Sequence, residues 1–194
     1  TQSIGALPFD VQEFQPDAVV ASGYKWLMGP YATGIAYFGE YFQNGKPIEN
    51  NWMNRLDSQN FANLVNYQDE YQPGAIRYEV GESANFILTP MLTEALRQVN
   101  AWRPENIQAY CKSIASEAQQ ELASMGYQIE SADYRSEHLF GIRLPKGLDL
   151  EKVKNRLVAD KVFVSVRGSS IRLSPHVYNT KEDFGSLLHS LRPA

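Results

Sequence analysis

The sequence predicts an α/β protein, on three observations. Short runs rich in β-branched and aromatic residues, each bounded by Gly, Pro or polar residues, are typical of strands. Longer stretches between them carry apolar residues at helical spacing. In the second part of the chain the two patterns alternate, as they do in small layered α/β domains.

Two strands and an irregular segment are expected first. The run 17–22, Asp-Ala-Val-Val-Ala-Ser, is apolar and bounded by Pro16 and Gly23, which predicts a buried strand. A second strand is expected at 33–38. Residues 39–75 are polar and aromatic, and we expect irregular structure there with one short helix.

Two helices come next. Apolar residues from 84 to 102 recur at helical spacing, which predicts the first helix. Pro104 stands where a second helix would begin, with Glu105 in its first turn. Gly126 follows the apolar stripe of this helix and is suited to end it as a C′ glycine.

Strands and helices alternate after Gly126. Strands are expected at 127–129, 138–144, 162–166 and 170–174. Asp149 is expected to cap a helix that continues to Lys161. Thr180, with Asp183 three residues later, resembles a capping box that opens a last helix.

Composition excludes several classes of protein. The chain has 194 residues, 12% of them aromatic, and a net charge of only −4, which argues against disorder. With 18 basic and 22 acidic residues it has no electrostatic footprint for nucleic acid. One cysteine, Cys111, forms no internal disulfide, and no apolar run reaches the roughly 20 residues of a membrane span. We expect a soluble, cytoplasmic protein that has no membrane association.

Common catalytic signatures are absent from the sequence. It holds no His-Glu-x-x-His, no Cys-x-x-Cys, no phosphate-binding Gly-rich loop and no Gly-x-Ser-x-Gly. The three histidines, His138, His176 and His189, are too dispersed to predict a metal site. No metal is therefore expected.

Lys25 is the candidate that remains. It follows directly on a predicted buried strand, in Ser22-Gly23-Tyr24-Lys25-Trp26. A lysine at the mouth of an apolar site loses water, which frees its amine to attack a carbonyl, as Schiff-base chemistry with an aldehyde cofactor requires. Hydroxyls of Ser22 and Tyr24 suit a phosphate. The alternative is a surface lysine whose stem lies along Trp26.

The surroundings of Lys25 resemble a known family. The run Thr-Gln-Ser-Ile-Gly-Ala-Leu-Pro-Phe-Asp-Val-Gln at 1–12, followed by Asp-Ala-Val-Val-Ala-Ser-Gly-Tyr-Lys-Trp-Leu-Met-Gly-Pro at 17–30, resembles the class V aminotransferase group of fold-type I pyridoxal-phosphate enzymes. That group includes cysteine desulfurases, kynureninases and isopenicillin-N-epimerase-like proteins. Arg-Leu-Ser-Pro-His-Val-Tyr-Asn-Thr at 172–180 resembles a segment near the C-terminus of the same group.

The resemblance implies a role for each matching residue near Lys25. Lys25 would hold pyridoxal 5'-phosphate as a Schiff base and move the substrate proton. Gln2 would hydrogen-bond the ring hydroxyl of the cofactor. Ser22 would bind its phosphate, and so would Tyr24, which stands where many relatives carry His.

Further roles are implied in the rest of the chain. Arg172 would pair with the substrate α-carboxylate, and Arg167 is a candidate for a second anionic group. Glu82 stands where relatives have a Thr that reaches the phosphate of the partner subunit. Ser83 or neighbouring backbone amides could replace that Thr, and Ser83 could equally be an ordinary N-cap.

The resemblance also implies what the chain lacks. The aspartate that pairs with the pyridine nitrogen would fall before Thr1, so we expect this chain to be the C-terminal half of a longer enzyme. Residues 1–98 would then be the C-terminal part of the cofactor-binding large domain, with its mixed sheet, and 99–194 the small α/β C-terminal domain. The short interval Gly168-Ser-Ser-Ile171 has no cysteine, so persulfide chemistry is not expected.

The expected function is that of a pyridoxal-phosphate-dependent enzyme acting on an amino acid, with transamination as the default reaction. Elimination, hydrolytic cleavage and epimerisation share the first steps and stay open. The family places its active site at a dimer interface, which implies a homodimer of the full-length protein. A non-catalytic chain that keeps the fold for binding is the alternative from another class.

Overall fold

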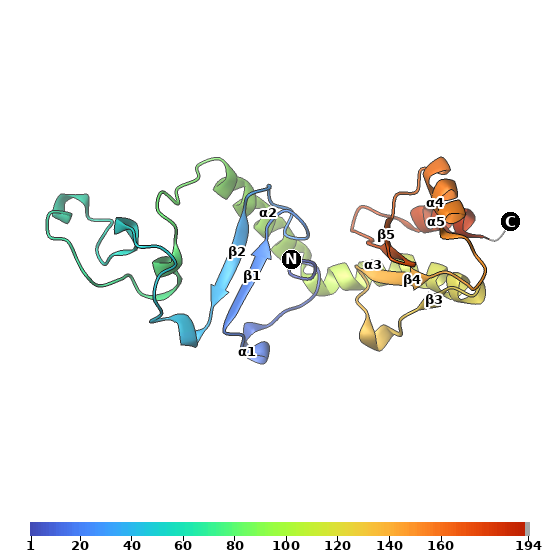
Figure 1. Ribbon diagram of the computed structural model, residues 1–194, viewed down its shortest axis with the longest axis horizontal. Helices are drawn as coiled ribbons and strands as arrows, with labels where there is room; N and C mark the ends of the chain where they lie inside the picture. Colours follow the sequence, from blue (N-terminus) through green and yellow to red (C-terminus); the bar gives the residue numbers. More distant parts are fainter. Residues whose placement is uncertain (193–194) are drawn as a thin grey trace. The chain divides into compact units, whose positions relative to one another are not determined.

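The computed structural model describes residues 1–192, which form two compact units (Figure 1). Unit 1 consists of Thr1–Ile4 and Phe9–Ala101. Unit 2 consists of Gly5–Pro8 and the described chain from Trp102 onward. The chain therefore leaves unit 1 for four residues, returns to it, and leaves it again after Ala101.

Unit 1 is built on an antiparallel pair of strands, β1 (Ala18–Ser22) and β2 (Gly34–Phe38). A short helix, α1 (Val11–Phe14), precedes β1 and is capped by Asp10. Both strands were expected, but the prediction that β1 is buried is wrong. Val20 is 74% exposed, because among the described residues this sheet has only two strands.

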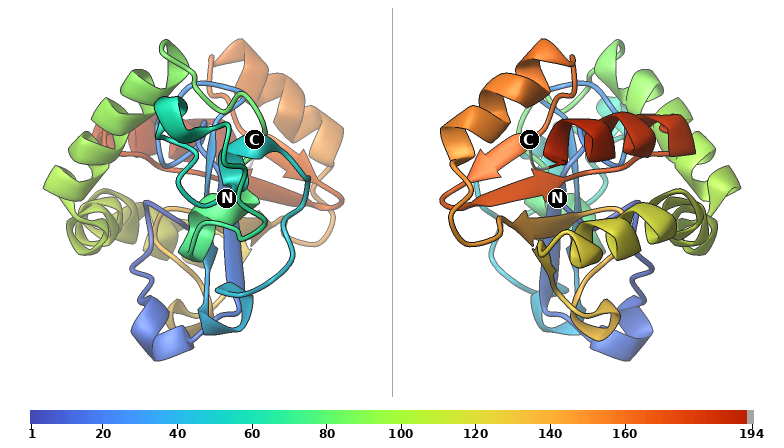
Figure 2. Two further views of the ribbon diagram at one scale, coloured as in Figure 1. Left: turned by 90° about the vertical axis from the view of Figure 1, so that its left-hand side faces the viewer. Right: turned by 90° about the vertical axis from the view of Figure 1, so that its right-hand side faces the viewer.

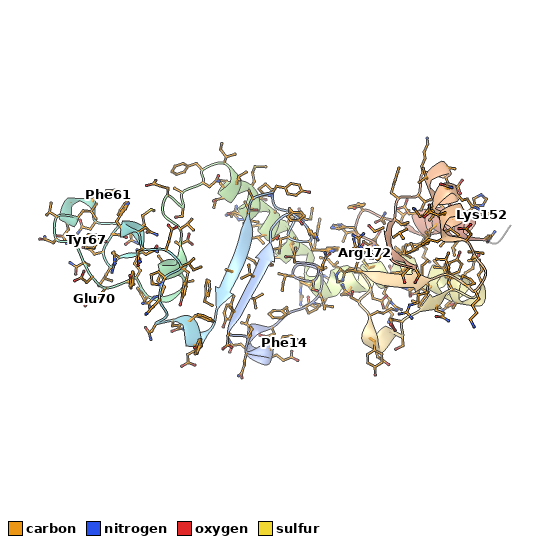
Figure 3. All side chains as sticks on the ribbon, viewed as in Figure 1. Phe14, Phe61, Tyr67, Glu70, Lys152 and Arg172 are labelled. Atoms are coloured by element: carbon orange, nitrogen blue, oxygen red, sulfur yellow. The ribbon has the colours of Figure 1, made fainter. Side chains whose placement is uncertain are left out.

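The segment between β2 and α2 is irregular, as predicted. Instead of one short helix it contains a series of 3₁₀ turns, because Asn, Gly and Pro interrupt it too often for an α-helix. The turns are η1 (Glu40–Phe42), η2 (Trp52–Asn54), η3 (Phe61–Asn63) and η4 (Gly74–Tyr78). Phe61 and Tyr67 lie in this segment (Figure 3). Stacking of Phe38 on Tyr78, with ring centroids 4.3 Å apart, joins it to β2.

Helix α2 (Leu88–Trp102) completes unit 1. It begins four residues later than the expected start at residue 84. Asn85 explains the difference, because its side-chain oxygen accepts a hydrogen bond from the backbone N–H of Leu88 at 2.7 Å. Pro90 is tolerated in the first turn, where its missing N–H has no helical partner to lose.

Unit 2 contains a four-stranded antiparallel sheet in the order β3-β4-β6-β5. Its strands are β3 (Gln128–Ile129), β4 (Phe140–Arg143), β5 (Ser165–Arg167) and β6 (Ser170–Leu173). A 3₁₀ turn, η5 (Ala132–Tyr134), connects β3 to β4. All four strands were expected, although β5 begins at Ser165 and not at residue 162.

Three helices cover one face of this sheet, α3 (Pro104–Ser124), α4 (Leu150–Ala159) and α5 (Lys181–Leu191) (Figure 2). Their apolar faces form one buried core with alternate residues of the strands, Phe140, Ile142, Ile171 and Leu173. The strand residues between these point to the opposite face, because side chains alternate along a strand. Unit 2 is thus a two-layer α/β fold.

The ends of these helices confirm most of the predicted caps. Gly126 has φ +87° and ends α3 in a Schellman motif, in which Tyr127 N–H donates to Leu122 C=O at 3.0 Å. Asp149 caps α4, although the helix ends at Ala159 rather than Lys161. Residues 1–192 contain no helix that is both long and apolar enough to span a membrane.

Candidate active site

The turn after β1 holds Lys25 on a hydrogen-bonded backbone. Gly23 N–H donates to Thr33 C=O at 2.8 Å, and Gly29 N–H donates to Gly23 C=O at 2.8 Å. Met28 N–H donates to Lys25 C=O at 2.9 Å, which closes the turn on the lysine itself. Backbone hydrogen bonds therefore hold the turn that carries Lys25, which is not a free loop.

Packing makes the turn rigid. A Cβ at Gly23 would lie 2.6 Å from Thr33 Oγ1 and 3.2 Å from Leu92 Cδ1, so only glycine fits between β2 and α2 at this point. The two residues after the lysine, Trp26 and Leu27, are buried and anchor the outgoing chain. Such a base fixes the direction of the Lys25 side chain better than an exposed loop would.

Lys25 is half-buried, and its amine makes no hydrogen bond or ion pair within residues 1–192. Its Nζ lies 5.6 Å from the centroid of the Tyr24 ring, and within residues 1–192 no carboxylate lies at ion-pair distance from it. Tyr24 in turn stacks on Tyr31, with ring centroids 4.6 Å apart. The Tyr24 hydroxyl makes no hydrogen bond to the described part of the chain. An amine and a phenol thus stand together with their donor capacity unused.

The backbone of Ser22 is bound by Thr1, a residue that its sequence context does not mark as functional. Thr1 Oγ1 accepts a hydrogen bond from Ser22 N–H at 2.9 Å and lies 3.5 Å from Ser22 Oγ. The long second contact leaves the Ser22 hydroxyl able to bind a further group. No local pattern marks Thr1, because its partner is 21 residues away in the sequence. Gln2 follows Thr1 directly and is exposed.

Ser83 lies in the loop before α2, and the alternative that it caps this helix is wrong. Asn85 is the cap instead, as described above. The residues just before Ser83 are held by the irregular segment: Gly81 N–H bonds to Glu49, and Glu82 N–H contacts the Met53 sulfur at 3.2 Å. Within residues 1–192, no hydrogen bond joins Ser83 to the turn of Lys25.

Arg172, labelled in Figure 3, and Arg167 alternate with core-facing residues of β6 and β5, so both lie on the face of the unit 2 sheet opposite the helices. Arg172 pairs with Ser165 across β5, and Arg167 pairs with Ser170, so all four side chains emerge from the same face. Arg167 is exposed and bonds only the neighbouring Val166 C=O, at 3.1 Å.

The Arg172 guanidinium has a donor without an acceptor. Its Nε is buried and makes no hydrogen bond, and its Nη2 has only a long 3.4 Å contact with Ser165 Oγ. It lines a pocket of about 330 Å³ whose other walls include Phe163, Phe184 and Leu187. A guanidinium in this state is suited to a carboxylate, which accepts two parallel hydrogen bonds from it.

The site residues therefore fall into two groups within their units. Ser22, Tyr24 and Lys25, with Thr1, gather at the end of β1 in unit 1. Arg172 and Arg167 share the open sheet face of unit 2. Residues 1–192 contain no cluster of three or more His, Cys, Asp or Glu side chains that could hold a metal ion.

Cys111 is not part of either group. It is fully buried in α3, where burial, and secondly the charge of Glu137, raises the pKa of its thiol to about 11. A thiol with this pKa is a poor nucleophile at neutral pH. Cys111 thus belongs to helix α3 and lies outside the interval between Arg167 and Arg172.

The sequence matches a protein family and a curated relative. The family described as Aminotransferase class-V matches residues 1–187. The curated protein called "Uncharacterized aminotransferase YcbU", from Bacillus subtilis strain 168, is 28% identical over 183 residues. That alignment covers 94% of this chain and 46% of the relative, so the chain spans about half the length of this curated relative.

Solved structures share the fold. The apo cysteine desulfurase of Thermococcus onnurineus NA1 matches with a TM-score of 0.75 and 20% identity, over 97% of this chain and 49% of that one. A C-DES variant with glycine covalently linked to its PLP cofactor matches with a TM-score of 0.77 and 20% identity, over 98% and 49%. These likenesses confirm the α/β fold of fold-type I pyridoxal-phosphate enzymes, over about half of each structure. The chain belongs to the class V aminotransferase family.

Proposed function

We propose that the protein containing this chain is a pyridoxal-phosphate-dependent enzyme of aminotransferase type that acts on an amino acid. Lys25 is the residue that holds the cofactor, through a Schiff base. The observation that carries this proposal is the uncommitted Lys25 amine on a rigid turn, beside two hydroxyl donors, in a chain that matches the family over residues 1–187.

The donors around Lys25 suit the cofactor. Ser22 and Tyr24 offer hydroxyl groups that can donate to a phosphate, and both have unused capacity. Gln2, next to the Thr1 that contacts Ser22, would bind the ring hydroxyl. Ser83 is proposed as a further phosphate ligand, of the partner subunit's cofactor. When bound, the cofactor supplies an aldehyde and an electron-withdrawing ring that stabilises negative charge on the substrate α-carbon.

Lys25 would then have a second task. Its amine would also serve as the base that takes the proton from the substrate α-carbon. The hydrogen-bonded turn from Gly23 to Gly29 holds the backbone of Lys25 in one conformation, which favours the positioning that proton transfer requires.

The two arginines would bind the anionic groups of the substrate. Arg172 has a buried donor without an acceptor, which a substrate α-carboxylate would satisfy. Arg167 shares its sheet face and would take a second anionic group. The buried Cys111 does not favour a desulfurase-type reaction, so transamination is the proposed reaction.

The whole protein is proposed to contain an upstream half, because the curated relative and the solved structures are about twice as long as this chain. That half would supply the partner of the pyridine nitrogen. We further propose a homodimer, located in the cytoplasm.

The test is an absorbance spectrum of the full-length protein with added pyridoxal phosphate, for the wild type, Lys25→Ala and Lys46→Ala. Lys46 is an exposed lysine of the same unit and serves as the matched control. We expect a protein-bound band near the visible edge in the wild type and in Lys46→Ala, and its loss in Lys25→Ala. A band that persists in Lys25→Ala contradicts the role of Lys25, and no band in the wild type contradicts the enzyme proposal.

A further inference from the structure

Tyr31 lies in a tight bend between the turn of Lys25 and strand β2. The bend contains two residues in the left-handed region, Met28 with φ +57° and Ala32 with φ +65°. Neither is glycine, so both positions carry backbone strain that their surroundings must hold in place. Strained residues of this kind cluster at functional sites, which makes the side chain that the bend presents a candidate for function.

Hydrogen bonds hold the bend in place. Thr33 Oγ1 donates to Pro30 C=O at 2.7 Å, across the residues that include Tyr31. Thr33 C=O in turn accepts from Gly23 N–H at 2.8 Å. Thr33 therefore fixes the backbone on both sides of Tyr31 and joins it to the turn that carries Lys25.

The bend places the ring of Tyr31 on the ring of Tyr24. The ring centroids lie 4.6 Å apart and the ring planes differ by 17°, which is a stacked arrangement. Such a pair is stabilised beyond the area that it buries. Tyr31 is 77% exposed, and its hydroxyl makes no hydrogen bond within residues 1–192. Neither burial in a core nor a hydrogen bond of its hydroxyl therefore accounts for the position of Tyr31.

The effect of the stack falls on Tyr24. The ring of Tyr24 is restricted by Tyr31, while its hydroxyl keeps its donor capacity within residues 1–192. Lys25 Nζ lies 5.6 Å from the centroid of the same ring. Without the stack, the Tyr24 side chain could turn to other rotamers and carry its hydroxyl away from this place. The stack thus keeps an unused donor beside the lysine.

We propose that Tyr31 is a positioning residue that holds the Tyr24 hydroxyl in place for the phosphate of the cofactor. Tyr31 acts through the ring of Tyr24 and gives no hydrogen bond to the phosphate itself. The inference rests on the proposed function, in which Tyr24 binds that phosphate. The stack itself can be tested in the protein without cofactor.

The first test is ¹H–¹³C NMR of the full-length protein without cofactor, with ring-labelled tyrosine and the Tyr24 signal assigned through Tyr24→Phe. A stacked aromatic ring shifts the proton signals of its neighbour upfield. We expect Tyr31→Ala to move the Tyr24 signal downfield and Tyr31→Phe, which keeps a ring, to leave it near its original position. A Tyr24 signal that Tyr31→Ala does not move would overturn the stack.

The second test measures the dissociation constants of pyridoxal phosphate and of pyridoxal, which lacks the phosphate, by titration of the Lys25-dependent band. We expect Tyr31→Ala to weaken binding of pyridoxal phosphate roughly three- to tenfold and that of pyridoxal less than about twofold. Tyr31→Phe should restore the wild-type affinity. Tyr41→Ala is the matched control, because Tyr41 belongs to the same unit and is 79% exposed, and it should change neither constant.

A double-mutant cycle shows whether Tyr31 acts through the hydroxyl of Tyr24. Tyr31→Ala is made in the wild type and in Tyr24→Phe, with thermal melting to confirm that each variant folds. In Tyr24→Phe it should weaken binding of pyridoxal phosphate less than about twofold, because a positioning residue has no effect once its target is gone. Equal losses in the two backgrounds, or equal losses for the two ligands, would overturn the inference.

Failure of the proposed function gives a different result. Absence of the Lys25-dependent band in the wild type contradicts the proposed function and thereby the consequence for the phosphate, while the NMR signal of Tyr24 still tests the stack. A band that forms with wild-type affinity in Tyr31→Ala overturns the positioning role alone.

Discussion

At the scale of single residues, burial decides which reactive groups are available. Lys25 and Cys111 are both nucleophiles by residue type, yet Lys25 is half-buried with an uncommitted amine and Cys111 is enclosed in the core of unit 2. The sequence distinguishes them through their neighbours. Ser22 and Gly23 precede the lysine, whereas the cysteine occupies the apolar stripe of a helix.

Cys111 is expected to resist alkylation in the folded protein. With a thiol pKa of about 11, only about one molecule in a thousand is thiolate at pH 8, and the sulfur is fully buried. Labelling with iodoacetamide, followed by mass spectrometry, should therefore be negligible in buffer and complete in denaturant. Rapid labelling of the folded protein would show that the thiol is accessible and would reopen cysteine-dependent chemistry.

Arg172 is expected to control binding of the substrate carboxylate. Arg172→Leu removes a charge-assisted bidentate partner worth about 2–3 kcal/mol, so kcat/KM for the amino acid substrate should fall roughly 30- to 150-fold. Arg143→Leu is the matched control, because Arg143 is exposed on the same sheet face, opposite Ser170. Equal losses in the two variants would contradict a specific role for Arg172.

At the scale of elements, helix ends were predicted best where the capping side chain bonds a backbone group only a few residues away in the sequence. Thr180 and Asp183 form the capping box of α5, as their spacing of three residues predicts. The start of α2 was misplaced for the opposite reason. The apolar residues of 84–87 fit the helical period, but the Asn85 side chain bonds the backbone and delays the helix to Leu88.

Loss of the capping box should destabilise unit 2 measurably. Thr180→Ala removes the hydroxyl that accepts from the backbone of α5 and should lower the free energy of unfolding by about 1 kcal/mol. Urea denaturation measures this difference. Ser186→Ala, at an exposed position of the same helix, is the control and should stay within about 0.5 kcal/mol of the wild type.

The contribution of Asp183 should depend on pH. Its pKa is lowered, first by the Thr180 backbone N–H and then by the Asn179 side chain. Its stabilisation is therefore fully present above the ordinary aspartate pKa of about 4 and is lost as the pH falls through the lowered value. Urea denaturation between pH 7 and pH 2 should show a smaller acid-induced loss of stability in Asp183→Asn than in the wild type. An identical loss in both proteins would contradict this assignment.

At the scale of the whole molecule, local sequence patterns predicted which elements form and in what order. They did not predict which residues are buried or which distant residues are in contact. All four strands and three helices of unit 2 lie close to their predicted positions, because their caps and apolar periods are local. The exposure of Val20 could not be predicted, since it depends on whether another segment packs on β1, which the local sequence does not encode. The Thr1–Ser22 and Gln108–Ala6 contacts also escaped prediction, because they join residues 21 and 102 positions apart.

The exposed apolar residues of unit 1 suggest how this chain behaves alone. Val20, Phe86 and Ile87 are each more than two-thirds exposed. Residues 1–194 expressed by themselves should therefore associate with increasing concentration in analytical ultracentrifugation, because β1 and β2 leave unpaired edges. The full-length protein should instead sediment as a discrete dimer. A monodisperse monomer of residues 1–194 would contradict the proposed upstream half as the cover of these residues.

The most direct test of the account is borohydride reduction of the full-length protein saturated with pyridoxal phosphate, followed by peptide mapping. Reduction converts the linkage between the cofactor aldehyde and a lysine into a stable secondary amine, which marks that lysine by its added mass. The account predicts the mark on the peptide that contains Lys25, at close to one per chain. A mark on another lysine, or none, would contradict the assignment of Lys25 as the residue that holds the cofactor.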